Sequence, residues 1–149
     1  MRSEAWGIFW GGLLCGVMDI TAALVVYGLF GLRPQRLLQG IAAGVLGPQS
    51  YQGGWGTALL GLFLHFVIAY GAATVFFAAS RWMRFLVEHA VVAGVLYGVA
   101  VYFFMQWVVL PLSKATRRPF SWEMMWIAVA IHMLCVGLPI ALSVRRFAR

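Results

Sequence analysis

Charged residues are scarce in this chain: Asp, Glu, Lys and Arg make up 10% of its 149 residues, and four of these are acidic. A soluble domain carries about a quarter charged residues, so the composition excludes an ordinary soluble fold. Cysteine is also scarce. Cys15 and Cys135 lie inside apolar segments and form neither a zinc-type spacing nor a C-x-x-C pair. We expect both thiols to behave as small buried hydrophobes.

Catalytic signatures are missing as well. The sequence contains no Ser-His-Asp arrangement, H-E-x-x-H pair, phosphate-binding loop or aspartate-rich metal motif. We therefore do not expect an enzyme. The formal net charge is +7, but the basic residues stand at the ends of apolar segments, where they favour phospholipid headgroups. The expected partner is the lipid bilayer and not nucleic acid.

Hydrophobic residues, by contrast, make up 63% of the chain, and its mean hydropathy is +0.89. They gather in four runs, each long enough to cross a bilayer as a helix. The sequence predicts an all-α integral membrane protein, with one transmembrane domain over residues 1–149 folded as a four-helix bundle. No small-residue cleavage site follows a short apolar core, so we expect the first span to be retained. The predicted spans are residues 5–30, 55–80, 87–112 and 121–144.

A shorter helix is predicted at residues 34–46, between the first two spans. Pro34 suits a first helical turn, and Gly47 followed by Pro48 is a stop signal. The segment is too short to span. One of its faces is apolar, and the other, which includes Gln39, is small and nearly featureless. We interpret it as an interfacial helix, with a re-entrant half-helix as the alternative.

Small residues share helix faces with the polar residues of the spans. Small faces let helices approach closely, so the glycines on these faces are predicted helix-packing positions. We expect some of these contacts to join copies of the chain in a homo-oligomer. Tyr102 and Gln106 are secondary polar positions, spaced by four from the two glycines of the third span. The residues concerned are Gly12, Gly16 and Asp19 in the first span, Gly61 and His65 in the second, Gly94, Gly98, Tyr102 and Gln106 in the third, and His132 in the fourth.

Three ionisable residues, Asp19, His65 and His132, fall at comparable depth near the middle of their spans. At a rise of about 1.5 Å per residue they lie within about one helical turn of each other. An ionisable side chain at that depth is costly and faces a partner or a pathway. The sequence therefore predicts a polar site at the membrane midplane, formed by these three residues.

The residues leave four interpretations of that site open. Asp19 paired with a histidine could lock the bundle, or a midplane carboxylate beside histidines could serve a small proton- or ion-coupled transporter or channel. His65 and His132 could instead bind a metal or haem. The chain could also be an accessory subunit that docks on a membrane-protein partner.

Four spans place both termini on one side of the membrane. Six basic residues belong to that side and five to the other, so the positive-inside rule gives almost no bias. The dense C-terminal cluster of Arg145, Arg146 and Arg149 favours both termini in the cytoplasm.

Four stretches together resemble a family of uncharacterised bacterial four-span inner-membrane proteins. They are LLQGIAAGVLG at 37–47, LGLFLHFVIA at 60–69, YGVAVYFFM at 97–105 and IHMLCVGLP at 131–139. The resemblance covers nearly the whole chain. It implies a four-span architecture in a bacterial inner membrane and carries no assigned activity.

Overall fold

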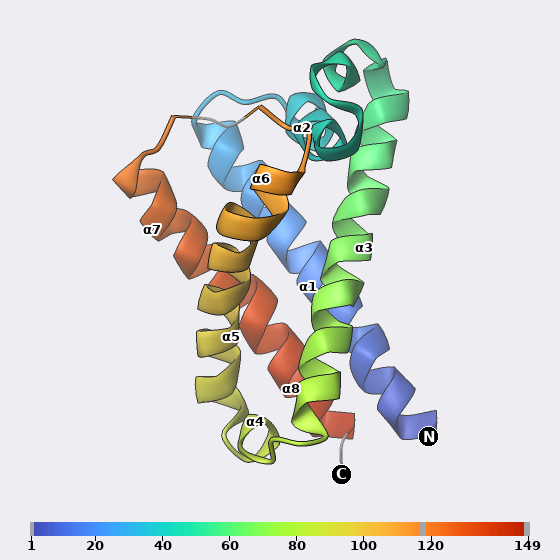
Figure 1. Cartoon of the computed structure of the whole chain (residues 1–149), viewed down its shortest axis with the longest axis vertical. Coiled ribbons are helices and arrows are strands. Elements are labelled where there is room, and N and C mark those ends of the chain that lie inside the picture. The colour runs from blue at the N-terminus through green and yellow to red at the C-terminus, as the bar shows by residue number, and fades with distance from the viewer. Residues whose placement is uncertain (1, 117–118, 148–149) are drawn as a thin grey trace.

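The computed structural model describes residues 2–116 and 119–147, which are helical over most of their length and form a four-helix bundle (Figure 1). Each span is long and apolar enough to cross a membrane, so the protein is a multi-pass membrane protein. The spans are α1 (Arg2–Leu29); α3 (Gly54–Ser80); α5 (Ala90–Phe104) continued by η2 (Met105–Val109) and α6 (Leu110–Leu112); and α7 (Trp122–Ile131) continued by η3 (His132–Gly137) and α8 (Leu138–Phe147).

The spans alternate in direction, so α1 begins and α8 ends at the same end of the bundle (Figure 1). We call this the terminal end. The short α4 (Phe85–Glu88) connects the second and third spans there. The opposite end, which we call the loop end, carries α2 (Pro34–Leu46) and the short 3-10 helix η1 (Pro48–Gln52).

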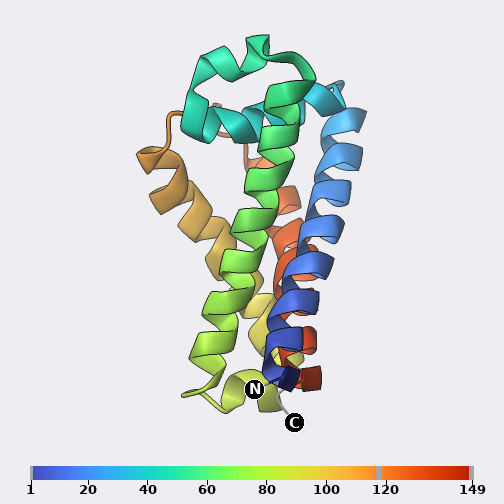
Figure 2. The same cartoon turned by 90° about the vertical axis from the view of Figure 1, so that its right-hand side faces the viewer.

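Helix α2 lies across the loop end and not alongside the spans (Figure 2), as an interfacial helix does. It begins at Pro34 and ends before Gly47, whose φ of 75° is a conformation that glycine adopts readily. A Cβ at Gly61 of α3 would overlap the carbonyl of Leu38, so the two helices touch through backbone at this point. The absence of a side chain at Gly61 is what lets α2 sit this close.

The polar face of α2 is not featureless, which corrects the expectation from sequence. Gln39 is 2% exposed, and its Nε2 donates a hydrogen bond to the carbonyl of Gly54 at 2.9 Å. Ser50 Oγ donates in turn to the carbonyl of Gln39 at 3.0 Å, and Thr57 Oγ1 donates to the carbonyl of Ser50. These bonds tie α2, η1 and the start of α3 together.

The third and fourth spans each contain one π-helical turn just before a proline. Proline has no amide hydrogen and crowds the carbonyl four residues earlier, so a helix opens its hydrogen-bond ladder nearby. The N–H of Leu110 bonds to the carbonyl of Met105, and that of Leu138 to the carbonyl of Met133, five residues back in both cases. The two segments, 105–111 and 133–139, share the pattern Met-x-x-Val-x-Leu-Pro.

The third span differs from the expected one at both ends. Gly94, Gly98 and Tyr102 are buried, but Gln106, four residues further on, lies in η2 and is exposed. The third span also begins later than expected. Backbone angles of −112° and 46° at His89 separate α4 from α5, so the long helix starts at Ala90 and not at residue 87.

The core fills the terminal half of the bundle, where Cys15, Phe76, Ile140 and Val144 are almost fully buried. The small residues pack inside this single chain. A Cβ at Gly12 or Gly16 would meet Tyr70 or Phe66 of α3, and one at Gly94 would meet the backbone of the fourth span. These faces are therefore filled by neighbouring helices of the same chain, and the homo-oligomer stays a prediction.

Candidate functional site: a polar cavity between the first and fourth spans

Asp19 and His132 line one small cavity between α1 and the fourth span. Its volume is about 80 Å³, which is room for about two or three water molecules at roughly 30 Å³ each. Tyr27 is the third polar side chain of the lining. The remaining lining residues are apolar: Ala23 and Val26 from α1, and Met124, Ile127, Ala128 and Ile131 from α7.

The cavity extends from the loop end toward the middle of the bundle. Tyr27 is two residues from the end of α1, and Met124 is two residues from the start of α7. Asp19 and His132 are each ten residues from those same helix ends. This corresponds to about 15 Å along a helix, or half of a hydrocarbon core about 30 Å thick.

His132 is held in a defined orientation. Its Nδ1 lies 2.8 Å from the carbonyl oxygen of Ala128, one turn earlier in its own span. A carbonyl oxygen only accepts, so Nδ1 carries the proton and Nε2 keeps the lone pair of the neutral ring. The Tyr102 ring meets the imidazole edge to face at 5.5 Å, and a Cβ at Gly98 would overlap the His132 carbonyl. The third span therefore supports the histidine from behind.

His65 does not line this cavity. Its Nε2 lies 2.9 Å from the carbonyl oxygen of Gly16 and donates a hydrogen bond across from α3 to α1. Gly16 is three residues from Asp19, so the three ionisable residues do lie within about one turn along α1. The bond joins His65 to the main chain of α1, and the cavity holds Asp19 and His132.

Asp19 forms no hydrogen bond or ion pair with any residue that the structure describes. Its side chain is half-buried. Among the described residues, therefore, no aspartate–histidine ion pair locks the bundle. A carboxyl group in a membrane span needs water, a proton or a counter-charge to be tolerated, and the cavity is the space from which Asp19 can obtain it.

Two of the expected polar positions play separate parts. Tyr102 is 7% exposed and contacts His132, whereas Gln106, one turn further along the span in η2, is exposed. Tyr27 was not expected in the site. Its signal was present in the sequence, because it is eight residues from Asp19 and shares that face of the helix.

A metal centre of ordinary type is not formed. Within residues 2–116 and 119–147, no group of three or more His, Cys, Asp or Glu side chains could hold a metal ion. His65 and His132 each use one ring nitrogen on a backbone carbonyl.

Compared with known proteins, the chain matches no family model, no curated protein and no solved structure. The four membrane-spanning helices and the polar cavity between α1 and α7 are therefore the findings from which function has to be inferred.

Proposed function

We propose that the protein is a small proton-coupled transporter whose coupling site is formed by Asp19 and His132. One observation carries the proposal. A carboxylate and an imidazole without a mutual ion pair line the same cavity, at mid-span depth, and that cavity extends to the loop end. Intramembrane acids and histidines in such positions are typical of proton relays.

The chemistry requires only side chains that line or adjoin the cavity. In the neutral ring, Nε2 of His132 is the basic nitrogen, because Nδ1–H remains bonded to the carbonyl of Ala128. Protonation at Nε2 gives an imidazolium beside the Asp19 carboxylate, and transfer of that proton neutralises the carboxylate and regenerates the imidazole. A histidine ring suits this role because it can accept a proton at one ring nitrogen while the other stays hydrogen-bonded.

A coupled transporter fits better than an open channel. Between the site and the terminal end, the core is packed with Cys15, Ile140 and Val144, which are at most 2% exposed. A proton that reaches Asp19 from the loop end therefore meets packed apolar side chains beyond it. Passage to the other side requires a rearrangement of α1 against the fourth span, and substrate movement can be coupled to that step.

Proton flux into proteoliposomes under an imposed pH gradient, followed with a trapped pH-sensitive dye, tests the proposal, because the rearrangement carries a proton bound at the site across the membrane with or without an accompanying substrate. We expect flux from the wild type, abolition by Asp19→Asn and a large reduction by His132→Gln. Glu123→Gln is the matched control, because Glu123 is an exposed acid in the first turn of the same span as His132. Flux in Asp19→Asn equal to that of the wild type would refute the proposal, provided that its helicity and gel-filtration profile are unchanged.

The other interpretations rest on weaker grounds. Haem or metal binding by His65 and His132 would need both rings in one space, whereas the described cavity contains one of them. Docking as an accessory subunit would use the small-residue faces and the surface helix α2. Neighbouring helices of the chain already cover the small-residue faces.

We further infer that the protein belongs with bacterial four-span inner-membrane proteins and has both termini in the cytoplasm. The resemblance of residues 37–47 and 131–139 supports the first inference, and the C-terminal arginine cluster supports the second. A C-terminal reporter enzyme that is active only in the cytoplasm tests the orientation.

A further inference from the structure

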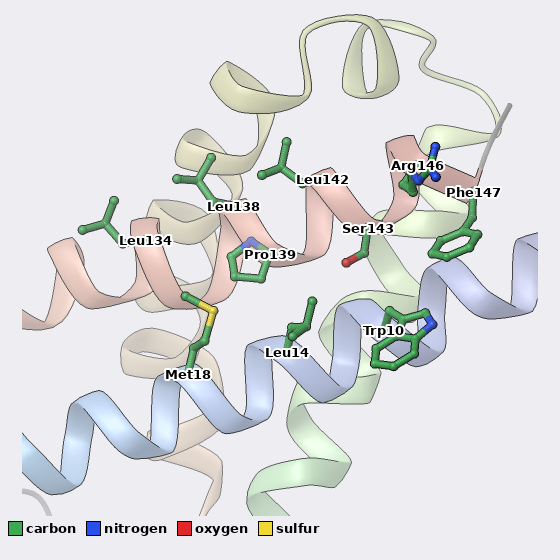
Figure 3. A pocket seen from close by; sticks show the side chains of 10 residues that line it. All are labelled: Trp10, Leu14, Met18, Leu134, Leu138, Pro139, Leu142, Ser143, Arg146 and Phe147. Carbon is green, nitrogen blue, oxygen red and sulfur yellow. The ribbon is translucent and has the colours of Figure 1, made fainter.

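An apolar groove runs between α1 and the fourth span in the terminal half of the bundle (Figure 3). Its volume is about 600 Å³. Two ridges of side chains with a spacing of four flank it, as expected for rows along a helix surface. One ridge is Trp10, Leu14 and Met18 of α1. The other is Leu134, Leu138, Leu142 and Arg146 of the fourth span.

The floor of the groove lies between these ridges and is formed by Pro139 and Ser143, which are both buried. The two helices approach closely beneath it. A Cβ at Gly11 would come within 3.5 Å of the Ile140 Cα, and one at Gly7 within 3.4 Å of the Val144 Cα. Close backbone contact under large ridge residues produces a furrow that the side chains of this chain leave open.

The groove faces the hydrocarbon of the membrane and has to be filled by something apolar. Five of its apolar ridge side chains are exposed, from 40% at Trp10 to 57% at Leu134, and Leu138 is half-buried. If each methylene group takes about the volume of a water molecule, roughly 30 Å³, the groove holds about 20 of them, which corresponds to one acyl chain.

The charge at one end of the groove identifies the lipid class. The ridge of the fourth span ends at Arg146, in the last turn of α8, and Phe147 and Trp10 lie beside this end (Figure 3). Arg146 forms no ion pair with the described part of the chain. A guanidinium group binds phosphate oxygens well, and indole rings favour the headgroup level. The opposite end, at Met18 and Leu134, is apolar.

We propose that this groove binds one anionic phospholipid from the leaflet at the terminal end, with its phosphate at Arg146 and one acyl chain along the furrow. The ridge from Leu134 to Arg146 is twelve residues long, or about 18 Å. This matches the depth of one leaflet, about 15 Å of hydrocarbon. The site is separate from the polar cavity, which lies toward the loop end.

Native mass spectrometry of the protein extracted from vesicles containing equal amounts of phosphatidylglycerol and phosphatidylcholine tests the proposal. We expect one phosphatidylglycerol per chain, bound roughly fivefold more often than phosphatidylcholine, as one basic contact predicts. Arg146→Ala should remove this preference. Arg145→Ala is the matched control, because it removes the same charge one residue away, outside the groove, and it should leave most of the preference intact.

A second pair of variants tests the acyl-chain contact. Leu14→Trp or Leu138→Trp fills the groove and should release the lipid, whereas Leu59→Trp, at a surface position of α3 that is 62% exposed, should retain it. Retention of the lipid by both groove-filling variants would overturn the proposal. So would equal losses in Arg146→Ala and Arg145→Ala, which indicate diffuse attraction. A dimer that dissociates when the groove is filled would assign the groove to a second copy instead.

Discussion

Replacing Gly98 with alanine tests whether the third span supports the candidate site from behind. A Cβ at this position would lie 2.7 Å from the carbonyl carbon of His132 and 2.6 Å from the Cα of Met133, and would also overlap the His132 carbonyl oxygen. These are backbone atoms, so they cannot move aside by changing a side-chain rotamer. The whole η3 turn would have to shift away from α5.

The expected destabilisation follows from two opposing effects. Overpacking a well-packed core costs about 1–3 kcal/mol, and rigid backbone neighbours place Gly98→Ala near 3 kcal/mol. Alanine recovers about 1 kcal/mol of helix propensity relative to glycine, which leaves a net loss of about 2 kcal/mol. Gly71→Ala is the matched control. Nothing lies within 4 Å of a Cβ there, so this variant should be neutral or up to about 1 kcal/mol more stable.

Unfolding in mixed micelles, followed by far-ultraviolet circular dichroism, measures both variants under the same conditions. Proton flux provides a second result, because a shifted η3 also displaces His132. Gly98→Ala should therefore lower the flux, whereas Gly71→Ala should leave it unchanged. A Gly98→Ala protein as stable as the Gly71→Ala protein would show that α5 and η3 are not in backbone contact. The third span would then not hold His132 in place.

Two further substitutions separate structural hydrogen bonds from the proposed coupling site. His65→Phe removes the bond to the Gly16 carbonyl, so we expect a loss of about 1 kcal/mol in unfolding free energy and no change in proton flux. The same two assays measure both. Abolished flux would instead place His65 in the proton pathway. Gln39→Leu removes the bond to the Gly54 carbonyl from a buried position, so we expect a loss of about 1–3 kcal/mol and faster proteolysis between α2 and α3. Unchanged stability and proteolysis would mean that α2 is held by apolar packing alone.

The architecture could be predicted from sequence because hydropathy and helix-end signals are local. Length and apolarity identify the four spans, and Pro34 is the first residue of α2, as expected. The side chain of Ser121 accepts a hydrogen bond from the Met124 amide at 3.4 Å, so it caps the N-terminus of the fourth span at the residue where that span was predicted to begin. Each of these features depends on residues within a few positions of each other.

The details that could not be predicted depend on interactions between elements or on a change of helical period. Spacing by four assigned Gln106 to the face of Tyr102, but Gln106 lies in the π turn near the end of the third span, where it is exposed. Gln39 looked unremarkable because its partners, Gly54 and Ser50, lie across a turn whose folded form the sequence pattern does not specify.

The three ionisable residues illustrate what depth along a span can and cannot determine. Depth is one coordinate. His65 bonds to the carbonyl of Gly16, three residues from Asp19, and Asp19 shares a cavity with His132. Direction around the helix is a second coordinate. Positions three apart, such as Gly16 and Asp19, differ by about 60° around the axis, so the carbonyl of Gly16 can meet α3 while Asp19 faces α7.

This difference in direction assigns the residues to different roles. His65 satisfies its N–H on a backbone carbonyl, which is the arrangement that a polar group in hydrocarbon requires, and no further partner is needed to explain it. Asp19 has no such partner among the described residues, and it shares its cavity with a histidine whose Nε2 is not used by the backbone bond. A group that is costly to keep in a membrane and is not used for packing is the stronger functional candidate. The activity should therefore depend on Asp19 and His132 and tolerate the loss of His65.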